Sequence, residues 1–173
     1  MISHIWIMRD YDRCVGCRLC EIACSLKHEG RIWPEASRIK IFEYAPGVFV
    51  PNLCIQCPDY PCVEKCPTKA LYVDEKTGAV KVDEGRCTLC GICVEICPVG
   101  SIYVVKDKKS VIICDLCDGE PECVKTCREL GYNALEIVPR PEINTLKLYA
   151  VKPEEIGRRI GEKIMRKGAG KVI

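Results

Sequence analysis

The chain has 173 residues, with 26 basic and 24 acidic side chains and a formal net charge of +2. This balance gives no indication of nucleic-acid binding, and the length suits one ordinary domain or two small ones. Sixteen cysteines stand against only two phenylalanines and two tryptophans. A purely apolar core would be thin, so we expect bound metal to contribute to the folding free energy.

So many cysteines would be typical of disulfides in a short secreted protein. Residues 1–9, however, lack a basic region followed by a long apolar run, and they contain no twin arginine. No stretch approaches the about 20 apolar residues that a transmembrane helix needs. We therefore expect reduced thiols in a cytoplasmic protein. One glutamine and three asparagines against 15 lysines and 16 glutamates resemble a thermophile's composition, although chance could produce this in a short chain.

The first segment, residues 1–50, is predicted to contain a strand, a cysteine group and a hairpin. The apolar run at 5–8 indicates the strand, and residues 20–28 indicate a helix that ends near Gly30. Period-two alternation around a turn at 38–50 predicts a hairpin inserted between two cysteine groups. The first group has Cys-x2-Cys-x2-Cys-x3-Cys spacing: Cys14, Cys17, Cys20 and Cys24.

The middle segment, residues 51–100, is predicted to contain two cysteine groups joined by a hairpin. A strand–turn–strand pattern at 70–82, with Gly78 in the turn, indicates that hairpin. The group before it has 2-4-3 spacing and is followed by Pro67: Cys54, Cys57, Cys62 and Cys66. The group after it has 2-2-3 spacing again: Cys87, Cys90, Cys93 and Cys97.

This third group, at residues 87–98, is the most informative stretch of the chain. It reads C-T-L-C-G-I-C-V-E-I-C-P, the Cys-x2-Cys-x2-Cys-x3-Cys-Pro run that binds a [4Fe–4S] cluster. Gly91 lets the loop turn without a Cβ clash, so that backbone N–H groups can point at the sulfurs. Cys93 and Cys97 share one face of a helical turn, which Pro98 ends. In this motif the fourth cysteine ligates a different cluster from the first three.

The last part of the chain contains the fourth group and a tail. A hairpin is predicted at 101–113 and a strand at 134–138. The group between them has 2-5-3 spacing and no proline: Cys114, Cys117, Cys123 and Cys127. In the tail, at 139–173, residues 146–150 indicate a further strand and residues 153–167 an amphipathic helix. Its apolar stripe packs either on its own chain or on a partner subunit: Ile156, Ile160 and Ile164.

The four groups use all sixteen cysteines, which predicts four [4Fe–4S] clusters. Four all-cysteine zinc sites would use the same number, but zinc sites usually pair Cys-x2-Cys motifs across a longer loop. Cys-x2-Cys-His does not occur, which excludes haem attachment, and no cysteine is spare for thiol catalysis. His4 and His28 are interpreted as ordinary surface or packing residues. Three arginines near the groups either raise cluster potentials or simply face solvent: Arg18, Arg86 and Arg128.

The order of strand, cysteine group, hairpin, cysteine group and strand occurs twice, which predicts an α+β fold of two ferredoxin-like units. The groups could pair in chain order, first with second and third with fourth. The Cys-Pro ending shared by the second and third groups, and the hairpin that joins them, instead favour nesting. We therefore expect an outer unit at 1–50 and 101–138, an inner unit at 51–100, and a C-terminal extension with a helix at 139–173.

Four cysteine groups in this order, with longer gaps in the second and fourth, resemble the four-cluster ferredoxin-like subunits of molybdenum and tungsten oxidoreductases. The resemblance covers residues 1–138 and depends on all sixteen cysteines. In size and composition the chain is most similar to the small iron–sulfur subunit of tungsten-dependent aldehyde oxidoreductases. The resemblance implies nested pairing and four ligand sets: Cys14, Cys17, Cys20 with Cys127; Cys114, Cys117, Cys123 with Cys24; Cys54, Cys57, Cys62 with Cys97; and Cys87, Cys90, Cys93 with Cys66.

No acid–base pair, phosphate loop or substrate pocket is recognisable, so we expect a non-catalytic electron conduit. The resemblance implies a cytoplasmic heterodimer, in an anaerobe, with a larger tungsto- or molybdopterin subunit that oxidises aldehydes. Electrons would pass to an external acceptor such as ferredoxin. The alternatives are a free polyferredoxin carrier and the electron-transfer subunit of a hydrogenase or formate hydrogenlyase-type complex. Neither a nucleic-acid partner nor a membrane span is expected.

Overall fold

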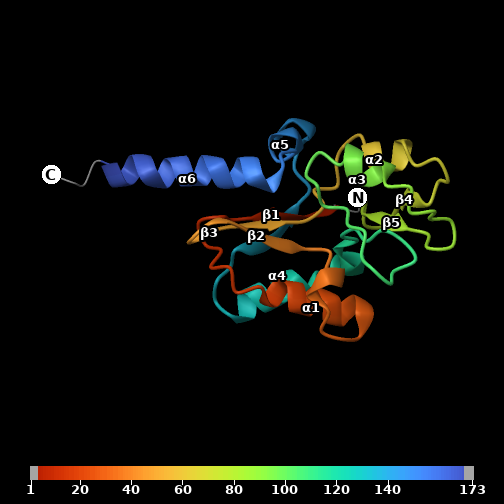
Figure 1. The fold of residues 1–173 in the computed structure, drawn as a ribbon, viewed down its shortest axis with the longest axis horizontal. Coiled ribbons are helices and arrows are strands. Elements are labelled where there is room, and N and C mark those ends of the chain that lie inside the picture. The colour runs from red at the N-terminus through yellow and green to blue at the C-terminus, as the bar shows by residue number, and fades with distance from the viewer. Residues whose placement is uncertain (1–3, 170–173) are drawn as a thin grey trace.

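The computed structural model describes residues 4–169 as a mixed fold of helices and strands (Figure 1). Within this range the strands form three separate two-stranded antiparallel sheets. The pairs are β1 (Ile5–Arg9) with β6 (Leu135–Pro139), β2 (Lys40–Ala45) with β3 (Val48–Asn52), and β4 (Leu71–Val73) with β5 (Val80–Val82). All six strands lie in or beside segments that the sequence predicts as strands.

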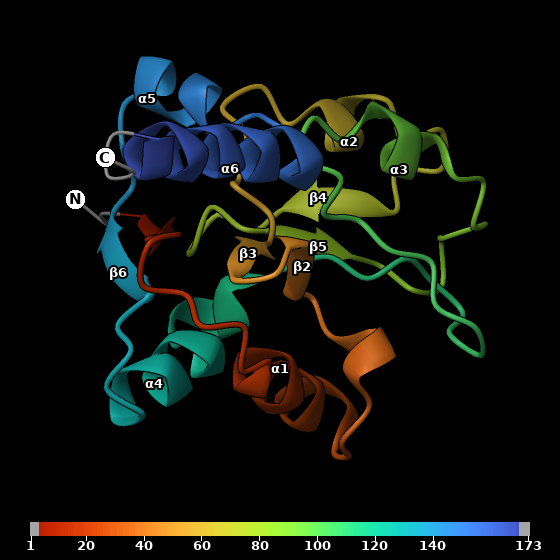
Figure 2. The same ribbon diagram turned by 60° about the vertical axis from the view of Figure 1, so that its left-hand side comes forward.

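Two pairs of helices occupy opposite sides of the molecule (Figures 1 and 2). On one side α1 (Leu19–Glu29) packs beside α4 (Glu122–Glu129), and on the other α2 (Pro61–Glu64) packs beside α3 (Ile92–Ile96). Each helix begins one residue before the third cysteine of a group. In α1 and α4 the third and fourth cysteines of the group lie one turn apart, whereas α2 and α3 end before the fourth cysteine.

The sheet of β1 and β6 joins two regions that are far apart in sequence. Ile7 lies opposite Ile137 in its register, and the Asp10 amide extends the pairing by donating to the Ala134 carbonyl oxygen at 2.8 Å. This pairing brings the first and fourth cysteine groups to the side of α1 and α4. The second and third groups meet at the side of α2 and α3, next to the short hairpin of β4 and β5.

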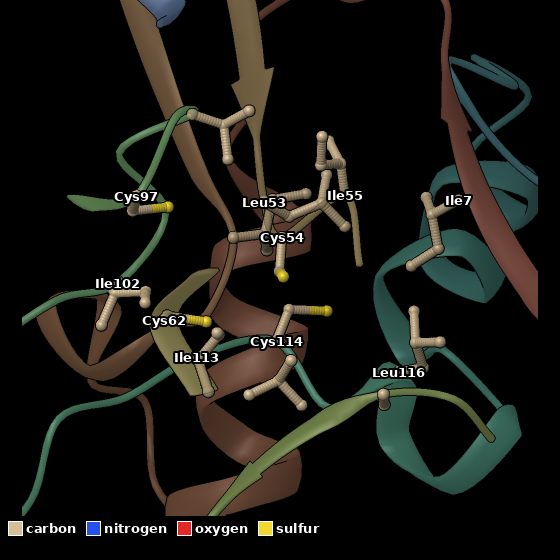
Figure 3. Close-up of a cluster of buried hydrophobic side chains, with 14 of the residues drawn as sticks. Ile7, Leu53, Cys54, Ile55, Cys62, Cys97, Ile102, Ile113, Cys114 and Leu116 are labelled. Carbon is tan, nitrogen blue, oxygen red and sulfur yellow. The ribbon is translucent and has the colours of Figure 1, made fainter. Parts of the chain in front are cut away.

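The core consists of cysteines among aliphatic side chains (Figure 3). Ile39, Leu53 and Ile55 are each at most 1% exposed. Within residues 4–169, Trp6 is the one aromatic residue that is buried. Its Nε1 donates to the Ile55 carbonyl oxygen at 3.0 Å. The apolar core is therefore small, and sulfur occupies much of its centre.

Two of the predicted strand segments are wrong. Residues 101–113 make one β-bridge, between Tyr103 and Ile112, in place of a hairpin. The amides of Tyr103 and Ile112 donate to each other's carbonyl oxygens at 3.0 and 2.8 Å, so the two arms of the segment pair at this position without forming strands.

The predicted strand at 146–150 instead overlaps helix α5 (Ile143–Leu148) and the turn after it. Two residues three positions apart face inward there. Leu146 is 1% exposed, and the ring of Tyr149 packs edge-on against Trp6 at 4.9 Å between centroids. Their i, i+3 spacing suits a helix. The apolar run at 146–150 alone does not distinguish a helix from a strand, so the predicted strand is wrong.

The predicted amphipathic helix, α6 (Pro153–Ala169), lies across the hairpin of β2 and β3 (Figure 2). Tyr44 of β2 packs against it. Ile156 and Ile160 are partly buried, whereas Ile164 is 52% exposed. The beginning of the apolar stripe thus packs on its own chain, and its end does not. No helix in the described part of the chain is both long and apolar enough to cross a membrane.

Candidate iron–sulfur centres

Lining residues and mutual effects on pKa values group the sixteen cysteines into four sets of four, and each set combines two cysteine groups. We call a set terminal where it includes an exposed cysteine and central where it does not. The first terminal set lines one cavity: Cys14, Cys17, Cys20 and Cys127. The second central set lines another: Cys54, Cys57, Cys62 and Cys97. The first central set is Cys24, Cys114, Cys117 and Cys123. The second terminal set is Cys66, Cys87, Cys90 and Cys93.

The cysteines of the first central set and of the second terminal set affect one another's pKa values. Burial raises the pKa of Cys123 well above its ordinary value, and the nearby sulfurs of Cys114, Cys24 and Cys117 raise it further. Burial also raises the pKa of Cys93 to about 11, and its three set members add to this effect. Such interactions require the sulfurs of a set to lie close together. The four ligand sets that the resemblance implies stay a prediction, which these neighbouring sulfurs support.

Each cysteine loop places a residue in the left-handed conformation immediately before its second cysteine. The φ angles are +70° at Gly16, +51° at Gln56, +54° at Leu89 and +60° at Leu116. One of the four is glycine, and the other three side chains bear a strain of about 1–2 kcal/mol each. The conformation aims amides at sulfur: the Gln56 amide donates to Cys54 Sγ at 3.4 Å.

The fourth cysteine of each group is held by hydrogen bonds from residues beyond its own helix or turn. Three of these bonds come from backbone amides: Arg38 to Cys24 Sγ (3.3 Å), Ser101 to Cys97 Sγ (3.4 Å) and Ala134 to Cys127 Sγ (3.3 Å). In the second group the Thr68 hydroxyl lies 3.7 Å from Cys66 Sγ. Hydrogen bonds to sulfur favour the thiolate and raise the potential of a cluster that the sulfur ligates.

The chemistry of the four sets fits iron–sulfur clusters. All sixteen cysteines are free. Burial raises the pKa of Cys57 to about 11 and that of Cys62 to about 12, so neutral thiols are the stable form without metal. Metal binding would release these protons and create the thiolate ligands. Each set could then hold one cluster through four sulfurs.

His28 lies beside the first central set, which the sequence interpretation missed. Its Nδ1 is 2.9 Å from the Cys24 carbonyl oxygen and 3.8 Å from Cys24 Sγ, and its Nε2 is 3.0 Å from the Asp115 carboxylate. Burial acts to lower the pKa of His28, but hydrogen bonds to Asp115 and Cys24 outweigh it and raise the pKa to about 10. The i, i+4 spacing of Cys24 and His28 was the available signal.

Neighbouring sets approach one another through pairs of cysteines whose charges interact. These pairs are Cys20 with Cys123, Cys54 with Cys114, and Cys62 with Cys93. Figure 3 shows Cys54 and Cys114 next to each other in the centre of the core. The packing of α1 on α4 and of α2 on α3 accounts for the first and the last of these approaches, and it suggests the order first terminal, first central, second central, second terminal, which we call the line of sets.

Gln56 ties the two central loops together. Its side chain is buried, with 1% exposed. Its Nε2 donates to the Cys114 carbonyl oxygen at 2.9 Å, and its Oε1 accepts from the Val80 amide at 2.9 Å. The single glutamine of the chain thus fixes the junction between the central sets.

Both ends of the line reach the surface. Cys17 and Cys90 are exposed, whereas no member of a central set is exposed. Large apolar side chains that are also exposed surround the two ends: Val15, Leu19, Leu130 and Tyr132 near Cys17, and Leu89 and Ile92 near Cys90.

Of the other residues singled out from the sequence, Arg18 lines the cavity of the first terminal set. Arg18, Arg86 and Arg128 are exposed, as the solvent-facing interpretation expects. Arg18 forms an ion pair with Glu21 at 3.6 Å. The ring of His4 packs against Gly78 in the β4–β5 turn, as expected of a packing residue.

Four cysteine loops, each with one residue in the left-handed backbone conformation before its second cysteine, are typical of an iron–sulfur protein of the ferredoxin type. A model for a 4Fe-4S dicluster domain matches residues 46–135, just over half of the chain, and a model for a 4Fe-4S binding domain matches residues 11–27. The chain belongs to the 4Fe-4S dicluster domain family.

Particular relatives make this assignment more specific. The polyferredoxin-like subunit of an aliphatic sulfonate oxidoreductase from Pyrococcus furiosus is 54% identical over 162 residues, which are 94% of each protein. The B subunit of the polysulfide reductase from Wolinella succinogenes is 34% identical, covering 88% of this chain and 86% of that protein. The electron transport protein HydN of Escherichia coli is 33% identical, covering 70% and 82%. The chain is a non-catalytic, iron–sulfur electron-transfer protein.

Proposed function

We propose that this chain is the electron-transfer subunit of an oxidoreductase and carries four [4Fe–4S] clusters, one in each cysteine set. When bound, the clusters supply one-electron redox chemistry. The protein supplies the ligands, the spacing between clusters and the hydrogen bonds to sulfur. One observation supports the proposal above the others: cysteines of two different groups line each of two cavities, and the exposed cysteines are Cys17 and Cys90.

The proposal divides the chain into two nested ferredoxin-like units. The outer unit, at 1–50 and 101–138, is supported by the pairing of β1 with β6 and by the packing of α1 on α4. The inner unit, at 51–100, is supported by the β4–β5 hairpin and by the packing of α2 on α3. Residues 139–173 form the extension with α6, of which the structure describes the part up to residue 169.

Electrons would enter at one exposed end and leave at the other. Cys17 and Cys90 mark these ends, and the apolar side chains around them would exclude water where a redox partner docks. The central sets would relay electrons through the interior, where no side chain of either set is exposed.

The partner would be a larger catalytic subunit with a tungsto- or molybdopterin, as the four-group pattern implies. Aldehydes are the substrates suggested by the resemblance in size and composition. The relative at 54% identity belongs to an aliphatic sulfonate oxidoreductase, which adds sulfonates to the substrates to test. We propose ferredoxin as the external acceptor and the cytoplasm as the compartment.

A free polyferredoxin carrier is the second candidate. Relatives named only as electron transport proteins favour it. A subunit of a hydrogenase or formate hydrogenlyase-type complex is the related alternative, and it predicts nickel or membrane subunits in the same preparation.

Metal analysis after native, anaerobic purification tests the proposal. We expect about sixteen irons for each copy of this chain, since each cluster holds four. Tungsten or molybdenum that co-elutes identifies the catalytic partner, and substrate-dependent reduction of the clusters by sulfonates, aldehydes or formate identifies the reaction. A chain that elutes alone with full iron supports the free carrier. A chain that contains zinc in place of iron overturns the electron-transfer function.

A further inference from the structure

A buried arginine, Arg9, lies at the end of β1 against Trp6, whose ring nitrogen donates to the carbonyl oxygen of Ile55, the residue after Cys54. Arg9 is 4% exposed, and its Nε and Nη2 atoms have no hydrogen-bond partner. Its guanidinium carbon lies 5.5 Å from the ring centroid of Trp6 and 5.4 Å from that of Tyr149. No carboxylate of residues 4–169 forms an ion pair with it.

The charge of Arg9 needs a negative partner. Arginine stays protonated at any pH that a protein experiences, and an unpaired cation in the interior is strongly unfavourable. Burial lowers the pKa of Arg9, whereas charges on Tyr11, Tyr149, Cys54 and Cys114 would raise it. Tyrosines are neutral near pH 7, and burial raises the pKa of Tyr11. The negative partners that remain are Cys54 and Cys114, which face each other at the middle junction.

We propose that Arg9 is a fixed counter-ion for the two central clusters and raises their reduction potentials above those they would otherwise have. This inference rests on the proposed function, because it requires clusters in both central sets. A cluster gains one negative charge when it is reduced, and a nearby cation stabilises that state. The interaction is strong because the site is buried and water does not screen it.

The location gives Arg9 a role that an exposed arginine cannot have. We expect its effect to be largest on the two central clusters, because Trp6 links its side chain to the loop that carries Cys54. A higher potential in the middle keeps an electron inside the subunit until a partner at either end removes it. The flanking rings of Trp6 and Tyr149 hold the guanidinium by cation–π contacts without neutralising it.

Three variants of the natively purified holoprotein test this role: Arg9→Met, Arg9→Lys and, as a matched control, Arg31→Met. Arg31 is exposed and stacks on Trp33 at 4.2 Å, so its variant also removes one charge and one aromatic contact. The readouts are iron content and an anaerobic redox titration followed by electron paramagnetic resonance. We expect Arg9→Met to lower two of the four midpoints. At fixed potential the ratio of reduced to oxidised central cluster should fall about tenfold, which is about 59 mV. Arg9→Lys and Arg31→Met should leave the midpoints close to those of the wild type.

Four unchanged midpoints in an Arg9→Met protein with full iron would overturn the proposal, as would equal shifts in Arg31→Met. If Arg9→Met loses iron, the iron content of Arg9→Lys distinguishes a role of the charge from a role in packing. Full iron in the lysine variant supports the role of the charge, and equal loss in both variants overturns it in favour of a packing role. The midpoints belong to the isolated chain, so they remain measurable even if no partner accepts its electrons. A wild type without iron would instead reject the proposed function itself.

Discussion

The central and terminal cysteine sets differ in burial although they are built from the same kind of loop. Every cysteine of the second central set is at most 9% exposed, whereas each terminal set has one exposed cysteine, Cys17 or Cys90. The loops that supply three cysteines to a central set are those with the longer gaps, x4 and x5. The regular 2-2-3 loops supply three cysteines to each terminal set. The extra residues therefore accompany burial, and the compact loops lie at the surface.

Removing one cysteine from a central set and one from a terminal set should give the largest difference in stability between two variants. Cys114→Ala removes a buried ligand that joins the fourth group to Cys24 of α1. A structural metal site contributes about 10–16 kcal/mol, as much as the about 5–15 kcal/mol of a typical domain. We expect this variant to lose electron transfer between the two ends and most of its thermal stability.

Cys90→Ala is the matched variant at the exposed end of the line. We expect it to lose at most one cluster, about four irons, and to stay folded, because the other three sets remain intact. Anaerobic thermal unfolding and iron analysis measure both variants. Equal losses of stability would show that burial does not separate central from terminal sets.

Oxidative loss of iron should divide the clusters into two classes. An oxidant in solution reaches the sets that contain Cys17 and Cys90 first, since the susceptibility of a thiolate follows its exposure. Holoprotein treated with ferricyanide should release about half of its iron in a fast phase and the remainder slowly, two clusters in each phase. A coloured iron chelator follows the release. A single phase would contradict the difference in access.

Two glycines in the terminal loops test how tightly the loops are covered. Gly16 and Gly91 have φ of +70° and +82°, so alanine at either position is strained by about 1–2 kcal/mol. A Cβ at Gly16 would lie 2.5 Å from the Phe49 ring, whereas a Cβ at Gly91 would meet nothing within 4 Å. We expect Gly16→Ala to cost about 1–3 kcal/mol more in unfolding free energy than Gly91→Ala.

The double variant Gly16→Ala with Phe49→Ala separates the clash from the strain. It should recover iron content relative to Gly16→Ala, because the smaller side chain leaves room for the new Cβ. If Gly16→Ala and Gly91→Ala unfold at the same temperature, then Phe49 moves freely and does not hold the first loop.

The sequence predicts the cofactor type and most of the fold because cysteine spacing and strand periodicity are local properties. All six strands and the helices that contain cysteines lie where the patterns place them. The misplaced segment at 146–150 has apolar residues whose spacing suits a strand or a helix, and contact with Trp6 selects the helix. Burial of the individual sets follows from long-range packing, which no local pattern contains.

Arg9 and His28 escaped the sequence interpretation for the same reason. Arg9 packs on Trp6, which donates to the carbonyl oxygen of Ile55, 49 positions away from Trp6. Asp115, the second partner of His28, is 87 positions away. By contrast, the arginines that lie near cysteines in sequence, Arg18 and Arg86, are exposed. Their role in tuning potentials stays a prediction, and Arg18 does line the cavity of the first terminal set.

An ion pair of Glu29 stabilises the part of the chain around the first central set, independently of any bound metal. Glu29, at the end of α1, has a side chain that is 9% exposed. It accepts hydrogen bonds from Arg38 Nη1 at 2.6 Å and from Lys108 Nζ at 3.0 Å. Arg38 also donates its amide to Cys24 Sγ, so this ion pair fastens the segment that holds a central ligand. Glu29→Gln should lower the unfolding free energy by about 1–3 kcal/mol.

The difference in unfolding free energy between the wild type and Glu29→Gln should decrease only at acidic pH. Burial acts to raise the pKa of Glu29, but hydrogen bonds from Arg38 and Lys108 outweigh it and lower the pKa below 4.5. The contribution is therefore complete above the ordinary pKa and is lost only as pH falls through the lower folded pKa. Wild type and Glu29→Gln should differ by the same amount throughout pH 5–8 in anaerobic thermal unfolding. Glu155→Gln, which removes exposed ion pairs from α6, should have a smaller effect because solvent screens them. A difference that changes between pH 5 and 8 would assign the stabilisation to another group, and the central set would then depend on its cluster alone.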